Sequence, residues 1–372
     1  MPGLYIHVPF CVKKCHYCNF VIAAGIPAAS RVRFLEALEK EVDHRKDALS
    51  NTIFDTVYLG GGTPSVLDAG EFERLFALLR ARFHWKKDAE ITCEANPGDV
   101  DGKKASLLRK LGVNRVSLGA QSFHDDTLQK LNRTHRSAEI ESSFRLLRDA
   151  GFDNINMDLI LSLPGEEWGR AKHSLEKLAA LKPEHVSIYE LSVEDKTVFG
   201  DLQARGKLEV PNEERQFETL SKARAFLKQQ GYNHYELLNY AKSGSESRHN
   251  LLYWANEDTV GFGPGAYTYF MGKRFRYTDG YQQYLSKVAA GDWANLEEET
   301  LAADKKEVES FLLALRLTRG AELARFAGVA GRFREEIRGL SEKGLIEESG
   351  GALRLTARGQ FLAETVFTEL SC

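Results

Sequence analysis

Up to residue 191, short apolar runs alternate with longer segments in which apolar residues recur every three or four positions. The short runs are typical of buried strands, and the longer periodicity is typical of helices that pack on one face. The runs predict strands at Leu4–Val8, Ile53–Leu59, Ala89–Ala95, Arg115–Gly119, Ile155–Leu161 and His185–Leu191. The periodic segments predict helices at Pro27–Leu49, Asp68–Phe83, Lys103–Leu111, Asp125–Leu131, Ala138–Ala150 and Glu166–Leu181.

Regular alternation of strand and helix favours a parallel sheet with right-handed crossovers. Six repeats fall short of the eight that close a barrel. We therefore predict an α/β fold with an open, curved (β/α)6 sheet. The spacing alone is also compatible with a flat, doubly wound sheet.

The pattern changes in the second half of the chain. A helix is predicted at Asn212–Gln230, and the segment Tyr232–Tyr269 is rich in Tyr, His, Asn and Gly. Further on, the pattern predicts helices at Lys305–Leu317, Gly331–Lys343 and Ala357–Glu369, with a hairpin about Gly350-Gly351. Helices with a late hairpin indicate a helical, winged-helix-like C-terminal domain. We expect three parts: a partial barrel at 1–240, a connecting segment at 241–300 and the C-terminal domain at 301–372.

Composition argues against several classes of protein. The chain of 372 residues is 43% hydrophobic, yet no apolar run reaches the ~18 residues of a membrane-spanning helix. The first predicted strand starts at residue 4 and leaves no room for a signal peptide, so we expect a cytoplasmic protein. A net charge of −3 and a C-terminal domain rich in glutamate argue against nucleic-acid binding.

Three cysteines follow the first predicted strand closely. Cys11, Cys15 and Cys18 form a CxxxCxxC array, and three thiolates on one short loop can surround a soft metal centre. Iron–sulfur clusters normally take four Cys ligands, so three would leave one iron open. The alternatives are a disulfide with a spare thiol, unconnected buried cysteines, or a structural zinc site completed by His7 or His16.

The two remaining cysteines carry no such pattern. Cys93 falls in a predicted strand, where core packing is expected, and Cys372 has no assigned role.

Polar and glycine residues cluster where the predicted strands end. Ligands of parallel α/β sheets bind at the carboxyl ends of the strands. Gly60-Gly61-Gly62-Thr63 follows the second strand, and glycine lets backbone approach a ligand closely. The polar candidates are Glu94, Gln121, Arg133 and Asp158. Taken singly, a tight turn explains the glycines, and a structural hydrogen bond or ion pair explains each polar residue.

A second group of candidates is His249-Asn250-Leu251-Leu252-Tyr253-Trp254. Histidine is a usual axial ligand of haem iron, and Tyr and Trp offer flat apolar faces. The alternative is an ordinary buried aromatic turn in which His249 caps and the aromatic side chains pack.

The cysteine array after a first strand resembles the radical S-adenosylmethionine (SAM) superfamily. The resemblance implies a partial barrel, with Cys11, Cys15 and Cys18 holding three irons of a [4Fe–4S] cluster and SAM chelating the fourth. Tyr5-Ile6-His7-Val8-Pro9-Phe10 resembles the oxygen-independent coproporphyrinogen III oxidase group. Its true oxidases carry a fourth cysteine two residues after the third. Phe20 stands there in this chain, which favours the sister branch of radical SAM haem chaperones.

The resemblance also implies roles for individual residues. Gly61, Gly62 and Thr63 would bind the amino end of the methionine moiety of SAM. The other residues that match the SAM-site pattern are Tyr5, Glu94, Gln121, Arg133 and Asp158. The HNxxYW pattern is a signature of the haem chaperone branch and implies haem binding in which His249 takes part. A direct bond between His249 and the haem iron is our hypothesis.

The first expectation is therefore a radical SAM haem chaperone that delivers haem to haem-requiring respiratory enzymes. It would receive electrons from a donor such as a flavodoxin, would bind no nucleic acid, and would meet a membrane only through its acceptor. The second is an enzyme of porphyrin biosynthesis, an oxygen-independent coproporphyrinogen III oxidase. The third is a zinc-stabilised barrel that acts as a binding module.

Overall fold

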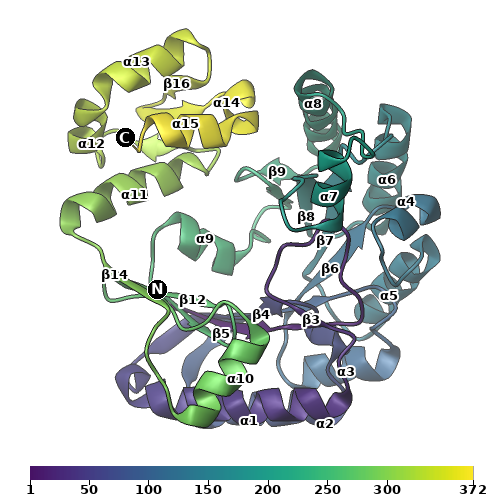
Figure 1. Ribbon diagram of the computed structural model, residues 1–372. Helices are drawn as coiled ribbons and strands as arrows, with labels where there is room; N and C mark the ends of the chain where they lie inside the picture. The colour runs from purple at the N-terminus through teal and green to yellow at the C-terminus, as the bar shows by residue number, and fades with distance from the viewer. Residues whose placement is uncertain (372) are drawn as a thin grey trace.

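Six parallel strands form the centre of the protein, which is described here from a computed structural model that covers residues 1–371 (Figure 1). They lie side by side in chain order as β1 (Gly3–Val8), β4 (Ile53–Gly61), β5 (His84–Ala95), β6 (Arg115–Gln121), β7 (Ile155–Leu161) and β8 (His185–Glu190). In a doubly wound sheet the strand order reverses at a switch point, and no reversal occurs here. The predicted partial barrel is therefore confirmed.

Helices follow the strands and cover the outer face of the sheet (Figure 1). They are α1 (Ala28–Arg45), α2 (Ala69–Arg82), α3 (Gly102–Lys110), α4 (Asp125–Lys130), α5 (Ser137–Asp149) and α6 (Trp168–Leu181). Helix α2 shows why the predicted bounds were close. Asp68 and Glu71 form a capping box, each accepting the other's backbone N–H, and this satisfies donors at the first turn.

The sheet extends beyond the six predicted strands at both edges. Beside β1 lies β11 (Thr259–Phe262), which is parallel to it, followed by the antiparallel strands β12 (Tyr267–Phe270), β13 (Lys273–Arg276) and β14 (Glu297–Thr300). Beyond β8 lie β10 (Asn239–Ala241) and β9 (Asn233–His234). The sequence did not predict these strands, because they are only two to four residues long and lack a run of apolar residues.

Further helices lie in the connections between strands of this sheet: α7 (Val198–Ala204), α8 (Glu213–Gln229), α9 (Arg248–Trp254) and α10 (Tyr281–Ala290). Helix α9 contains the HNLLYW sequence, so this segment is a helix rather than a turn. Its N-cap is Ser247, whose side chain accepts from the N–H of Asn250.

The C-terminal part has its own small sheet and core. Its elements are, in chain order, α11 (Ala303–Leu315), β15 (Ala321–Glu322), α12 (Ala327–Arg332), α13 (Arg334–Glu342), β16 (Ile346–Ser349), β17 (Ala352–Leu355), α14 (Ala357–Phe361) and α15 (Ala363–Glu369). The predicted hairpin is present as β16–β17. The closing helix was predicted as one and is two, interrupted at Leu362. The second predicted helix is likewise divided at Phe333.

Buried apolar side chains form a large cluster in the barrel and a separate one in residues 311–370. The division of the chain at residues 240 and 300 stays a prediction. Within residues 1–371, none of the helices combines the length and the apolar character that crossing a bilayer requires. Cys372 lies outside the described residues.

Gly359 offers a test of the C-terminal packing. A Cβ at this position would overlap the carbonyl oxygen of Leu345, whereas a Cβ at Gly331 would meet nothing within 4 Å. We expect Gly359→Ala to lower the free energy of unfolding by about 1–3 kcal/mol, because backbone must shift to make room. Denaturant unfolding followed by circular dichroism measures this. Gly331→Ala is the control, and equal stability of the two variants would contradict the packing described.

Candidate functional site

The three cysteines lie on the loop that connects β1 with α1. Strand β2 (Phe10–Cys11) pairs with β3 (Ala23–Ala24), so this loop closes on itself at its base. The N–H of Cys18 donates to the carbonyl of Cys15 (3.2 Å), which places these two residues in one tight turn. All three thiols are partly exposed, and all three line one cavity of about 360 Å³, here called the cysteine cavity.

Most predicted SAM-site residues line this same cavity. Most of them come from the carboxyl ends of successive strands and the turns after them, whereas Asp158 lies within β7 and Arg133 follows α4. They are Gly61, Gly62, Thr63, Glu94, Gln121, Arg133 and Asp158. Tyr5 and His249 are not on this wall: Tyr5 lines a neighbouring cavity, and His249 is buried between α9 and the sheet.

The thiols have specific polar neighbours. The Cys11 Sγ lies 3.4 Å from the Thr63 hydroxyl, and the Arg133 Nη1 lies 3.5 Å from the Cys15 Sγ. Burial raises the pKa of the Cys11 thiol to about 11, although the Thr63 hydroxyl opposes this rise. A bound metal centre would supply the positive charge that keeps such a thiol deprotonated at neutral pH.

The glycine-rich turn holds the cysteine loop against β4. The N–H groups of Gly62 and Thr63 donate to the carbonyls of Val8 (2.9 Å) and Phe10 (2.7 Å). A Cβ on Gly61 would lie 2.5 Å from the His7 ring, and φ at Gly61 is +105°. The glycines are therefore needed for this close backbone approach whether or not a ligand is bound.

Two partly exposed carboxylates lie in the barrel beside the cysteine cavity. Glu94 accepts hydrogen bonds from the Tyr58 hydroxyl (2.8 Å) and the Gly61 N–H (3.1 Å), and burial raises its pKa to about 7. Asp158 accepts from the Asn156 amide (2.7 Å), and burial raises its pKa as well. Both carboxylates thus have partners in the protein and also reach the cavity wall.

The cavity wall also carries polar atoms that no protein group satisfies. Gln121 Oε1 and Glu190 Oε1 are buried without a hydrogen-bond partner. Gln121 has a φ of +65° and sits at an irregularity in the pairing of β6 with β7, which redirects its side chain. Buried acceptors are normally paired, so these two atoms fit a ligand that brings hydrogen-bond donors. SAM, with ribose hydroxyls and an ammonium group, has that chemistry.

The structural zinc alternative finds no support in the histidines. Both ring nitrogens of His7 are engaged, by the Tyr5 hydroxyl (3.1 Å) and the Val21 carbonyl (2.8 Å), and His16 Nδ1 contacts the carbonyl of Lys130 (2.8 Å). In residues 1–371, no three His, Cys, Asp or Glu side chains are grouped closely enough to hold a single metal ion.

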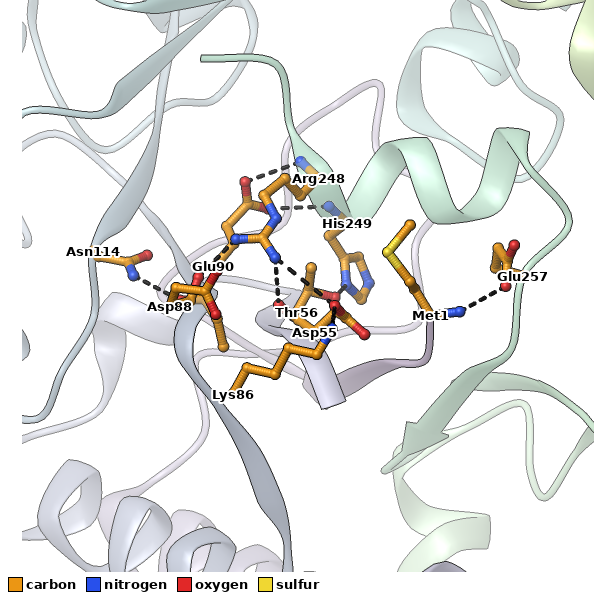
Figure 2. A network of polar contacts seen from close by, with 11 residues as sticks. Met1, Asp55, Thr56, Lys86, Asp88, Glu90, Asn114, Arg248, His249 and Glu257 are labelled. Atoms are coloured by element: carbon orange, nitrogen blue, oxygen red, sulfur yellow. Dashed lines mark hydrogen bonds and ion pairs between the residues drawn. The ribbon is translucent and has the colours of Figure 1, made fainter. Parts of the chain in front are cut away.

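His249 lies on helix α9, close to Thr56 and Glu90 of the sheet (Figure 2). Its Nδ1 lies 2.7 Å from the Thr56 hydroxyl, and its Nε2 lies 3.0 Å from the Tyr253 hydroxyl. The ring stacks on Tyr58 and is 1% exposed. The carboxylate of Glu90 accepts the backbone N–H groups of His249 and its neighbour Arg248. A bond between His249 and a haem iron would require one of these ring contacts to break, so it stays a prediction.

The two aromatic residues of the HNLLYW motif, Tyr253 and Trp254, contact different parts of the protein. Tyr253 lines the cavity next to the cysteine cavity. The guanidinium of Arg316 lies over the Trp254 ring, 4.3 Å from the ring centroid. Just after the motif, the Asn256 amide donates to the Ser310 hydroxyl (3.0 Å). The motif therefore joins the barrel to the C-terminal domain.

Sequence reasoning missed several residues of the cysteine cavity. Asn96 contacts Arg133 and lies 3.3 Å from the Thr63 hydroxyl, and Glu190 carries one of the unpaired acceptors. Both lie at the carboxyl ends of predicted strands, so the rule that located Glu94 could have found them.

Residues 5–195 match the Radical SAM superfamily, and residues 302–362 match the HemN C-terminal domain. The class of protein that the fold and the three-cysteine cavity indicate is thus a radical SAM protein. Three similar curated proteins carry the name "Heme chaperone HemW". The one from Bacillus subtilis is 36% identical over 99% of this chain and 98% of its own length. The one from Lactococcus lactis is 35% identical over 98% of this chain and 95% of its own length. The one from Escherichia coli is 32% identical over 90% of this chain and 88% of its own length.

The chain belongs to the HemW heme chaperone family of radical SAM proteins. Among solved structures, "Coproporphyrinogen III oxidase (HemN) from Escherichia coli is a Radical SAM enzyme" superposes with a TM-score of 0.88. The match covers 99% of this chain and 89% of the other at 24% identity. At that identity the likeness establishes the shared fold alone.

The buried imidazole of His249 predicts a dependence of stability on pH. Burial, and then the charge of Arg115, lowers the pKa of His249 from 6.5 to about 3. At a pH between these two pKa values, the folded protein therefore binds fewer protons at His249 than the unfolded chain does. Because of this difference, stability falls as the pH drops below 6.5, by about 1.4 kcal/mol per pH unit for this group.

Urea unfolding of the wild type and of His249→Gln, from about pH 7 to about pH 5, measures this effect. We expect the wild type to lose more stability than the variant on acidification, while His84→Gln, at an exposed histidine, should follow the wild type. Identical pH slopes for wild type and His249→Gln would contradict a neutral, buried imidazole.

Proposed function

We propose that this HemW-family chain holds a [4Fe–4S] cluster on Cys11, Cys15 and Cys18 and binds SAM beside it. The observation that carries the proposal is the cysteine cavity. One hollow gathers three thiols, the glycine-rich turn and two unpaired buried acceptors. A bound cluster with SAM would supply one-electron reductive chemistry, and the protein would contribute ligand binding, orientation and exclusion of water.

The proposed roles of the cavity residues follow from their chemistry. Gly61, Gly62 and Thr63 would bind the amino end of the methionine moiety, where the glycines let backbone come close. The Arg133 guanidinium suits the SAM carboxylate, and Glu94 suits the ribose hydroxyls. Gln121 would complete the polar wall with its unpaired oxygen, and Asp158 would lie beside it.

We further propose that the protein binds haem and delivers it to haem-requiring respiratory enzymes, with electrons from a donor such as a flavodoxin. The relatives are named heme chaperones, which supports haem as the molecule that the protein carries. The cytoplasm suits the proposal as a compartment, because thiolate ligands persist in a reducing environment. Contact with a membrane would come through the acceptor enzyme.

Oxygen-independent coproporphyrinogen III oxidation is the second candidate, and the fold is compatible with it. The residue at position 20 weighs against it, because Phe20 cannot act as a thiolate where the oxidases carry a fourth cysteine.

The cluster assignment predicts a selective loss of iron. After anaerobic reconstitution, Cys18→Ser should lose most of the bound iron and sulfide and its charge-transfer absorption, because one of three ligands is replaced. Cys93→Ala is the control: Cys93 is buried in β5, away from the loop, and should leave iron content unchanged. Wild-type protein that binds zinc and no iron–sulfur cluster would contradict the assignment.

A separate experiment distinguishes chaperone from oxidase. The reconstituted wild type, given coproporphyrinogen III, SAM and a reductant, should form no protoporphyrinogen, while titration with haem should produce a saturable Soret shift near one equivalent. Product formation at rates above those of Cys18→Ser would overturn the chaperone assignment in favour of the oxidase.

A further inference from the structure

The β12–β13 hairpin presents two tyrosines and two arginines on one face. The register pairs Tyr267 with Arg276 and Tyr269 with Arg274. Because side chains alternate between the two faces of a strand, these four side chains lie together. The guanidinium of Arg276 lies 4.9 Å from the Tyr267 ring centroid, and that of Arg274 lies 5.6 Å from the Tyr269 ring centroid.

This face forms one wall of a cavity of about 700 Å³, here called the hairpin cavity. Tyr253 of α9, Leu313 of α11 and Tyr5 of β1 contribute other parts of the wall. The volume falls within the roughly 300–1,000 Å³ of sites that enclose a small molecule. Aromatic faces and cationic heads in one hollow suit a flat ligand that carries anionic groups.

Phe20 lies where the hairpin cavity meets the cysteine cavity. Asn19, Phe20, Gly61 and Glu94 line both hollows. The Phe20 side chain is 66% exposed, although it is large and apolar. A flat apolar ligand in the hairpin cavity would cover this ring and remove it from water.

The wall of the hairpin cavity carries both positive and negative charges, and its two arginines have N–H donors that their ion pairs do not use. Arg274 pairs through Nη2 with Glu309, and Arg276 pairs through Nε with Glu297 (2.8 Å). Each guanidinium carries five N–H donors, so an ion pair through one nitrogen leaves others for a further carboxylate. The remaining acidic groups on the wall are Glu94, whose pKa burial raises to about 7, and Glu257, which pairs with the N-terminal amine.

We propose that the hairpin cavity is the porphyrin site, with the macrocycle against Phe20, Tyr253 and Tyr267 and the propionates on Arg274 and Arg276. This inference rests on the proposed haem function and assigns its site. In this arrangement His249 is a positioning residue: its Nε2 contact holds the Tyr253 hydroxyl (3.0 Å), and iron ligation by His249 is not required.

The test uses the full-length, reconstituted protein and three probes: haem, iron-free protoporphyrin IX, and protoporphyrin IX dimethyl ester. The iron-free probe removes any contribution of iron ligation, and the ester removes the carboxylates. The variants are Arg274→Gln with Arg276→Gln together, and Phe20→Ala. Arg338→Gln, at an exposed arginine of α13, is the matched control. Fluorescence titration gives the affinity, and iron content with circular dichroism verifies the fold.

We expect the double arginine variant to bind protoporphyrin IX about tenfold more weakly or worse than wild type and control, because charge-assisted contacts are lost. The ester should bind wild type and double variant equally. Phe20→Ala, at an exposed side chain that the fold does not need, should also bind more weakly. Unchanged affinity of a folded double variant, or of Phe20→Ala, would overturn this site while leaving the proposed function standing. A wild type that binds neither haem nor porphyrin would overturn the proposed function itself.

Discussion

Two backbone hydrogen bonds hold the cysteine loop on the barrel, and the rest of the site depends on them. The N–H groups of Gly62 and Thr63 reach the carbonyls of Val8 and Phe10 across the ends of β4 and β1. They are possible because Gly61 and Gly62 have no Cβ, which would otherwise meet the His7 ring and the backbone of Pro9 and Phe10. Through them the first cysteine of the array is set beside the Thr63 hydroxyl, and the other two follow within a tight turn. The parallel strand order then places the remaining polar residues on the same rim.

Much of this arrangement could be predicted from the sequence, because the signals are local. Six apolar runs and the helices between them have strong periodicity, and their chain order fixes which ends share a rim. The cysteine array and the glycine turn are short motifs with a clear physical purpose. Glu94 and Gln121 could be located because each lies at the carboxyl end of a strand, whereas Arg133 follows helix α4 and was proposed from the family resemblance. Their assignment to SAM rests on the family resemblance rather than on spacing.

Other features depend on contacts that no local pattern reveals. The edge strands β11–β14 are only four residues long, and it is their pairing with β1 and with each other that makes them strands. From its residues alone, the motif around His249 was compatible with a buried aromatic turn, and haem binding was inferred from the family resemblance. In the fold the motif is a helix whose histidine binds Thr56 on a strand 193 residues earlier in the chain. The break in the last helix at Leu362 also has no clear sequence signal. Such outcomes are set by tertiary packing, which a linear pattern does not record.

The partition between the two hollows has a thermodynamic consequence. Glu94 and Phe20 belong to both, so whatever occupies one side acts on groups that the other side also uses. A ligand in one cavity that changes the charge of Glu94 or the rotamer of Phe20 would change the affinity of the other cavity for its ligand. By thermodynamic linkage, each ligand changes the binding free energy of the other by the same amount. If haem strengthens the binding of the cofactor, the cofactor strengthens the binding of haem equally. Binding and release of the two ligands would then be coupled through the residues that line both cavities.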